Sequence, residues 1–222
     1  MRLLLINPNT SLHITERVAT SARCALEPGD ELAAVTASAG PQVVRSAADL
    51  REAEVSALSL ADAHAAQHDA IVLAISLDGA APRLRERHPN LAVVGMTEAA
   101  LLTACLRTER IGVLTLGAAL LPLYRQRVEQ VGVASRVAAY EAPEAPDAFA
   151  SGGPHVSADL LDVLSAACGR LRRSGAQAVV LAGAVLCGYA AALESRCAMP
   201  VFDGVACAVR QARLLIAARS TG

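Results

Sequence analysis

A short polar segment with hydrogen-bonding side chains follows the first apolar run of the chain. The run Leu3–Ile6 is typical of a strand covered on both faces of a parallel sheet, and Asn7–Ser11 (NPNTS) comes directly after it. Thr10 or the serine after it can cap a helix. Open α/β sheets bind ligands where a strand ends and a helix begins. We therefore expect Asn7, Asn9 and Thr10 to offer amides and a hydroxyl to a polar, planar ligand. A capped turn without a ligand is the alternative.

An internal repeat divides the chain. It has an offset of 108 residues, which places Ala70 on Ala178. The matching segments are DAIVLA (69–74) with AQAVVLAG (176–183), RLLL (2–5) with RIGV (110–113), and LAVVGMTEAAL (91–101) with MPVFDGVACAV (199–209). Strands that alternate with helical patterns predict an α/β fold with parallel sheets. The repeat predicts two pseudo-symmetric halves, with a cleft between the carboxyl ends of their strands.

The ends of the repeated strands carry further candidate residues. Those expected to contact a ligand are Ile75, Leu77, Thr115, Gly183, Ala184 and Val185. Backbone N–H groups after Ser76 and after Gly183 can hold a carboxylate or enolate oxygen, as they do at helix N-termini. Gly183 lets a ligand approach the backbone closely. Ser76 is a candidate catalytic residue, with a plain helix cap as the alternative.

Titratable residues near these strand ends are first expected to have structural roles. Asp78 fits either a helix N-terminal charge or a carboxylate in the cleft, and we favour the helix. Asp203 ends a strand, where a turn or cap is the default, and Glu98 fits the first turn of a helix. His13 and His155 flank the expected cleft. Each reads as a surface or capping histidine, although either could supply a base near neutral pH.

Two long helices and one loop are predicted between the strands. Helical patterns fill residues 47–67 and 157–173, and Ser46 with Asp49 resembles a capping box for the first of them. The segment 141–155 (EAPEAPDAFASGGPH) is rich in residues that break helices and strands. We expect it to form a loop at the cleft.

The composition limits the classes of partner. The chain has 222 residues, 54% of them hydrophobic, which is enough for a sizeable core in one large or two small domains. Its 20 basic and 21 acidic side chains favour neither nucleic acid nor a membrane surface, and 2% aromatic residues offer few stacking platforms. The uncharged stretch Ser174–Leu193 is long enough to span a membrane, but its glycines favour a strand, a loop and a helix. A small-molecule substrate is the expected partner.

The cysteines indicate neither a metal site nor an oxidising compartment. All six lie outside CxxC pairs and outside the spacings typical of zinc ligands, so we expect no metal. The first apolar run is too short for a signal peptide, and we expect a cytoplasmic protein with reduced thiols.

Four motifs together resemble a known family. INPNTS, DAIVLA, GMTEAAL and MPVFDGVACAVRQA are similar to segments of the aspartate/glutamate/hydantoin racemase superfamily, most of all its hydantoin and allantoin racemase branch, and the similarity runs from Arg2 to about Ile216. The resemblance implies two Rossmann-like halves, residues 1–96 with a C-terminal helix at about 204–218, and residues 97–203. It also implies an active site between the halves, no metal or organic cofactor, and a homo-oligomer.

The family's catalytic cysteines are missing from this sequence. Racemases of this type use one cysteine at the end of the equivalent strand in each half, so that one thiolate removes the α-proton while the opposite thiol returns one. Here those strands end in Ile75 and Gly183, and a slip of one or two residues restores no cysteine. Cys187 lies four residues beyond Gly183, where we expect the first turn of a helix. It is a candidate catalytic thiol, with a buried structural role as the favoured alternative.

These observations predict a cofactor-independent protein of the racemase and isomerase type. Its substrate would be a small carboxylate, a hydantoin or a related compound with an acidic α-proton, and the two-cysteine mechanism is not expected. A decarboxylase-type lyase, as in the arylmalonate branch, is one alternative. A non-catalytic protein that binds a small ligand on the same fold is the other.

Overall fold

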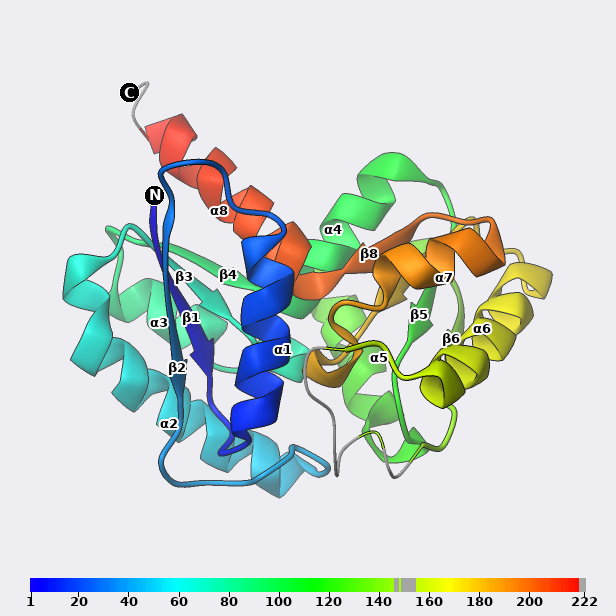
Figure 1. The fold of residues 1–222 in the computed structure, drawn as a ribbon, viewed down its shortest axis with the longest axis horizontal. Helices are drawn as coiled ribbons and strands as arrows, with labels where there is room; N and C mark the ends of the chain where they lie inside the picture. The colour runs from blue at the N-terminus through cyan, green and yellow to red at the C-terminus, as the bar shows by residue number, and fades with distance from the viewer. Residues whose placement is uncertain (146–147, 149–154, 220–222) are drawn as a thin grey trace.

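The computed structural model describes residues 1–145, 148 and 155–219, which form two parallel sheets side by side (Figure 1). The first sheet has the strand order β2-β1-β3-β4 and the second has the order β6-β5-β7-β8. The strands of the first are β1 Arg2–Asn7, β2 Glu31–Thr36, β3 Ala70–Leu73 and β4 Ala92–Gly95. Those of the second are β5 Ile111–Leu114, β6 Val137–Glu141, β7 Ala178–Leu181 and β8 Val201–Asp203. The predicted α/β fold with two halves is confirmed.

Eight α-helices lie between and after these strands in the described residues. They are α1 Leu12–Arg23, α2 Ala47–His64, α3 Ala81–Arg87, α4 Met96–Arg107, α5 Leu121–Val131, α6 Ala158–Arg173, α7 Ala190–Cys197 and α8 Gly204–Arg219. Short 3₁₀ turns are Ala65–Gln67, Ser76–Asp78, Ala118–Leu120, Ala134–Arg136 and Ala184–Leu186. Both predicted long helices are confirmed, as α2 with the turn after it and as α6. The Ser46 hydroxyl accepts a hydrogen bond from the backbone N–H of Asp49 at 3.1 Å, as the predicted cap requires.

The internal repeat is preserved in the register of the strands. Leu3 pairs with Ala70 in the first sheet, and Ile111 pairs with Ala178 in the second. Ile111 lies 108 positions after Leu3, and Ala178 lies 108 positions after Ala70. The two sheets are therefore built from equivalent residues. The buried strand residues Leu3–Ile6 have no exposed surface, which explains their continuous apolar sequence.

Two helices cross between the halves. α4 follows β4 of the first sheet and packs on β7 of the second, whereas α8 follows β8 of the second sheet and packs on β3 and β4 of the first (Figure 1). They meet at Gly204, where an added Cβ would lie 2.9 Å from the carbonyl oxygen of Met96, so the close crossing requires glycine. The expected boundaries of the two halves, after residues 96 and 203, fall where β4 and β8 end. The division into domains itself stays a prediction.

The segments that were ambiguous in the sequence have ordinary structures. Ser174–Leu193 contains β7, a 3₁₀ turn and the start of α7, as expected. Within the described residues, no helix combines the length and apolar character that a membrane span requires. Of the loop expected at 141–155, Glu141 ends β6 and residues 142–145 are irregular. Residues 146–147 and 149–154 of that prediction lie outside the described residues.

Candidate functional site

A cavity of about 240 Å³ lies between the carboxyl ends of the two sheets. Ile75 and Ser76 line it after β3, and Gly183 and Ala184 line it after β7, so the predicted shared cleft is confirmed. The other described residues around it are Asn9, Ile14, Val43, Val44, Arg45, Ala74, Thr115, Leu116, Gly117, Ala118, Ala119, Leu120, Tyr124, Glu144 and Val185. Most of these side chains are apolar, so polar groups are confined to a few positions.

Three residues expected to contact a ligand do not line the cavity. Asn7 is fully buried, and its Nδ2 donates to Asn9 Oδ1 at 3.0 Å and to Thr15 Oγ1 at 2.9 Å, so it supports Asn9 from behind. The backbone N–H of Thr10 donates to the carbonyl of Pro41, toward the loop after β2. Leu77 has a φ of 71°, which turns its side chain into the apolar cluster of α4 and α5.

The predicted cap residue of the first helix is confirmed, but the expected side-chain hydrogen bond is absent. Ser11 is the N-cap residue of α1, but its side chain makes no capping hydrogen bond. The Ser11 hydroxyl donates instead to the carbonyl of Gln42 at 2.6 Å. It therefore ties the start of α1 to the loop that carries Val43, Val44 and Arg45 along the cavity.

Cys187 also lies outside the cavity. It is 1% exposed, and it precedes α7 rather than lying in its first turn, because Gly188 adopts a left-handed φ of 86° that helices exclude. Burial, followed by the charge of Asp203, raises the pKa of its thiol well above the ordinary value. A buried, protonated thiol does not act as a base, so this placement favours the structural role.

Three hydroxyl groups surround Gly183. A Cβ at this position would lie 3.8 Å from Ser76 Oγ, 3.9 Å from Thr115 Oγ1 and 3.9 Å from the phenol oxygen of Tyr124. The Tyr124 phenol donates to the carbonyl of Ala182 at 2.9 Å. Desolvation raises the pKa of Tyr124, although its interactions with Ser76 and Thr115 act in the opposite direction. The three oxygens form a neutral, hydrogen-bonding surface on the cavity wall.

Tyr124 and the two charged residues at the cavity were not predicted. Tyr124 comes from α5, ten residues beyond the end of β5, and its signal in the sequence was its scarcity, because the chain has three tyrosines. Arg45 and Glu144 come from the loops after β2 and β6. Glu144 Oε1 accepts from the backbone N–H of Ala118 at 3.3 Å, which holds its carboxylate beside the cavity. Of the described lining residues, Arg45, Tyr124 and Glu144 are the titratable ones.

A buried carboxylate lies behind the Ser76 turn. Asp78 accepts from the backbone N–H groups of Thr97 and Glu98 at 2.9 and 2.7 Å, at the start of α4. Its oxygen also lies 3.3 Å from the Arg127 guanidinium. Desolvation raises the pKa of Asp78 to about 6, against the opposing effects of Arg127 and of the two amides. The helix role favoured for Asp78 is confirmed, with α4 as the helix.

The remaining titratable candidates lie away from the cavity wall. Asp203 accepts from the N–H groups of Val205 and Ala206 at the start of α8, so its predicted capping role is confirmed. Glu98 is in the first turn of α4, as expected. His155 is exposed, and neither His155 nor His13 is among the described residues that line the cavity.

Two parallel sheets with a ligand-sized cavity between their facing strand ends define an α/β protein built from two related halves. The Asp/Glu/hydantoin racemase family matches residues 3–212, and the chain belongs to this family. A hydantoin racemase of Paenarthrobacter aurescens is 28% identical over 221 residues, which cover 98% of this chain and 92% of that protein.

Two solved structures share the whole fold with this chain. The allantoin racemase from Klebsiella pneumoniae has a TM-score of 0.90 and 31% identity, with 99% of this chain and 89% of that one covered. The allantoin racemase from Pseudomonas fluorescens has a TM-score of 0.87 and 26% identity, with 99% and 92% covered. The predicted superfamily and its hydantoin and allantoin branch are confirmed.

Proposed function

We propose that the protein binds a small carboxylate, a hydantoin or a related carbon acid in this cavity and stabilises the enolate that forms when its α-proton leaves. The observation that carries this proposal is the group of three hydroxyls around Gly183, from Ser76, Thr115 and Tyr124. The relatives named as hydantoin and allantoin racemases support a cyclic amide as the ligand class.

The hydroxyl protons can be assigned by simple counting. Each hydroxyl has one proton, and the proton of Tyr124 is already donated to the carbonyl of Ala182. The protons of Ser76 and Thr115 therefore remain for an oxygen of the ligand. Such donors stabilise an enolate oxygen because they are fixed before charge develops on it.

The proton acceptor that we propose is Glu144. It is the carboxylate among the described lining residues, whereas burial raises the pKa of the Tyr124 phenol. Racemisation by two bases needs a second group on the opposite face of the α-carbon, where Ile75 and Gly183 offer none. The proposal is therefore a reaction that proceeds on one face, with exchange of the α-proton faster than inversion.

Deuterium exchange at the α-carbon tests this proposal. A panel of 5-substituted hydantoins, allantoin, aspartate, glutamate and malonates is incubated with the protein in D₂O and followed by NMR and chiral chromatography. We expect exchange of at least one compound without matching racemisation. The variants Ser76→Ala and Thr115→Val should each slow it by about 10²-fold, the usual cost of losing one such donor. Tyr140→Phe, on β6, is the control and should have no effect.

A decarboxylase is the second candidate, because decarboxylation of a malonate forms the same enolate without removal of a proton by a base. Carbon dioxide release from the malonates in the panel would favour it. Saturable binding without exchange or carbon dioxide release would establish the ligand-binding alternative. Racemisation of a panel compound at an ordinary enzymatic rate would refute the one-face reaction and our interpretation of the missing cysteines.

A further inference from the structure

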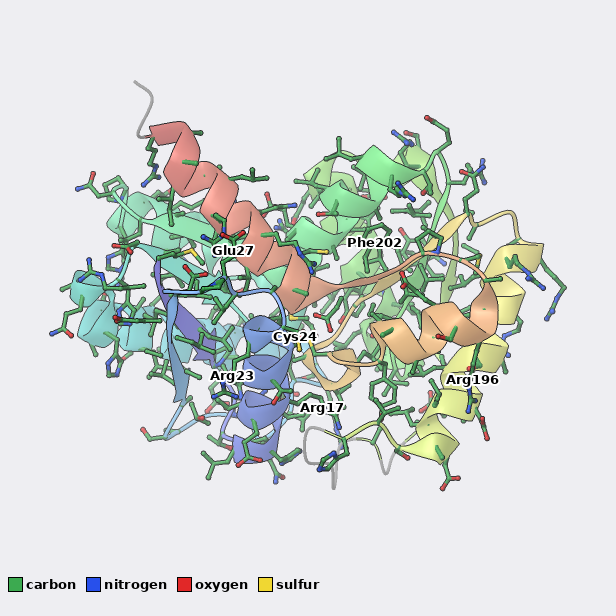
Figure 2. All side chains as sticks on the ribbon, turned by 45° about the horizontal axis from the view of Figure 1, so that its top comes forward. Arg17, Arg23, Cys24, Glu27, Arg196 and Phe202 are labelled. Atoms are coloured by element: carbon green, nitrogen blue, oxygen red, sulfur yellow. The ribbon has the colours of Figure 1, made fainter. Side chains whose placement is uncertain are left out.

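Helix α1 connects the two walls of the cavity. Asn9, just before the helix, and Ile14, in its first turns, line the cavity from the first half. Further along the same helix, Arg17 and Ser21 are 5% exposed each, and both donate hydrogen bonds to residues of the second half. Figure 2 shows Arg17 where α1 borders the second half. Since an α-helix is stiff over this length, a contact at Arg17 or Ser21 fixes the second half relative to Asn9.

Both contacts converge on one peptide group, the bond between Cys187 and Gly188. Its carbonyl oxygen accepts a hydrogen bond from Arg17 Nη1 at 3.2 Å. Its N–H donates to Asp203 Oδ2 at 2.7 Å, and Asp203 Oδ1 accepts from the Ser21 hydroxyl at 2.7 Å. The donor and the acceptor of this peptide group are thus both held from α1, one directly and one through Asp203.

Further contacts of Arg17 make its position specific. Its Nη2 donates to the carbonyl of His155 at 3.0 Å, and its guanidinium carbon lies 5.3 Å from the ring centroid of Tyr189. A buried guanidinium is stable only where its N–H groups have partners, so a shift of the helix along its axis would break several hydrogen bonds together. The arrangement permits little sliding of one half on the other.

The held peptide group directly follows the cavity wall of the second half. Gly183, Ala184 and Val185 line the cavity, and the turn Ala184–Leu186 ends at Cys187. The N–H of Cys187, which belongs to the preceding Leu186–Cys187 peptide group, donates to the carbonyl of Ala184 at 3.2 Å, so a displacement of Cys187 would move this wall.

We propose that Arg17 and Ser21 are positioning residues, which act through the Cys187–Gly188 peptide group to fix the Gly183–Val185 wall relative to Asn9. This inference rests on the cavity being the functional site. It does not depend on which reaction occurs there, and its test needs no substrate.

The three tyrosines of the chain supply the test. Tyr189 contacts Arg17, Tyr124 donates to the carbonyl of Ala182 next to the wall, and Tyr140 on β6 is a reference. The protein is labelled with ¹³C at the ε ring carbons of tyrosine, and the three signals are assigned with Tyr140→Phe and Tyr189→Phe. The test variant is Arg17→Met. Its control is Arg23→Met, since Arg23 lies in the same helix and is exposed.

We expect Arg17→Met to move the signals of both Tyr189 and Tyr124, although Arg17 touches only the first of these rings. In Arg17→Lys the Tyr124 signal should lie closer to its position in the unmodified protein than in Arg17→Met, because an ammonium can still donate to the carbonyl of Cys187. Arg23→Met should leave all three signals in place.

A second pair of variants keeps the test decisive if Arg17→Met does not fold. Ser21→Ala removes the hydrogen bond to Asp203, and Thr20→Ala removes an exposed hydroxyl of the neighbouring residue. We expect only Ser21→Ala to move the Tyr124 signal. If the Tyr124 signal stays in place in every variant that folds, or if Tyr140 moves as far as Tyr124, Arg17 and Ser21 merely stabilise the fold and the proposal is wrong.

Discussion

Replacement of Gly183 by alanine tests the backbone of the cavity wall. Gly183 has a φ of 149° and a ψ of 134°, a conformation that residues with a Cβ rarely adopt. The nearest atoms to an added Cβ are the three hydroxyl oxygens at 3.8 to 3.9 Å, which is ordinary contact, so crowding contributes little. The cost is therefore backbone strain, of order 1–3 kcal/mol. For a chain of this size we expect the melting temperature to fall by about 2–12 °C.

The same substitution at another glycine supplies a control of opposite sign. Gly169 lies inside α6, and a Cβ there would meet only Arg173 Nη1 at 3.6 Å. Gly169→Ala should therefore stabilise the protein by about 0.5–1 kcal/mol, since alanine loses less backbone entropy in a helix.

Thermal and urea unfolding of both variants measure these changes. Gly183→Cys should lose as much stability as Gly183→Ala, because the strain comes from the backbone and not from the side chain. A thiol at this position therefore cannot be introduced without a loss of folding stability. If Gly183→Ala melts at the temperature of the unmodified protein, the wall does not have the described conformation, and the reasoning on its three hydroxyls is refuted.

Three further predictions concern charge and reactivity. Arg127→Met leaves the Asp78 carboxylate buried without its cation and should cost about 3 kcal/mol at pH 8. The pKa of Asp78 is already raised to about 6 in the folded state, so ionisation disfavours folding. The loss should shrink below pH 5, where the acid is neutral; equal losses in urea unfolding at pH 5 and pH 8 would contradict this. In the native protein, Cys187 should react with iodoacetamide far more slowly than the exposed Cys24, as read by mass spectrometry; similar rates would place the Cys187 thiol at the surface. Glu144→Gln keeps an acceptor for the N–H of Ala118 but should slow α-deuterium exchange by at least about 10²-fold, and an unchanged rate would exclude Glu144 as the base.

The fold could be predicted because the repeat specifies backbone positions. Apolar strands separated by helical patterns determine parallel pairing, and the constant offset brings Ala70 and Ala178 to equivalent places in two sheets. The positions of Ser76 and Gly183 at the cavity follow directly from the strand ends. The position of the Leu77 side chain could not be predicted in this way. Its left-handed φ reverses the direction of the side chain, and no glycine at this position signals such a turn.

The rest of the site depends on contacts between distant segments. Tyr124 reaches the cavity from a helix, and Arg45 and Glu144 reach it from loops, so their places follow from tertiary packing and not from any local pattern. For Cys187, in contrast, the sequence did contain a signal of its position before the helix. Gly188 directly after it favours a left-handed turn and argues against the first turn of a helix at that point.

The carboxylates at the start of the crossing helices show how the two halves keep one arrangement with different residues. In the second half, Asp203 accepts from the N–H groups of Val205 and Ala206. In the first half, the equivalent N–H groups are those of residues 97 and 98, and they donate to Asp78.

The residue equivalent to Asp203 is Gly95, and this glycine makes the exchange possible. A Cβ on Gly95 would lie 2.4 Å from the carboxyl carbon of Asp78, so the space that the Asp203 side chain takes in one half is filled by Asp78 in the other. Asp78 belongs to the turn that carries Ser76, and Asp203 binds the N–H of Gly188, just after the turn that carries Ala184. In both halves a carboxylate thus connects the start of a crossing helix with the turn at the cavity. The repeat preserves this connection while the residue that makes it changes, which is why equivalence by offset locates the cavity but does not identify its supporting side chains.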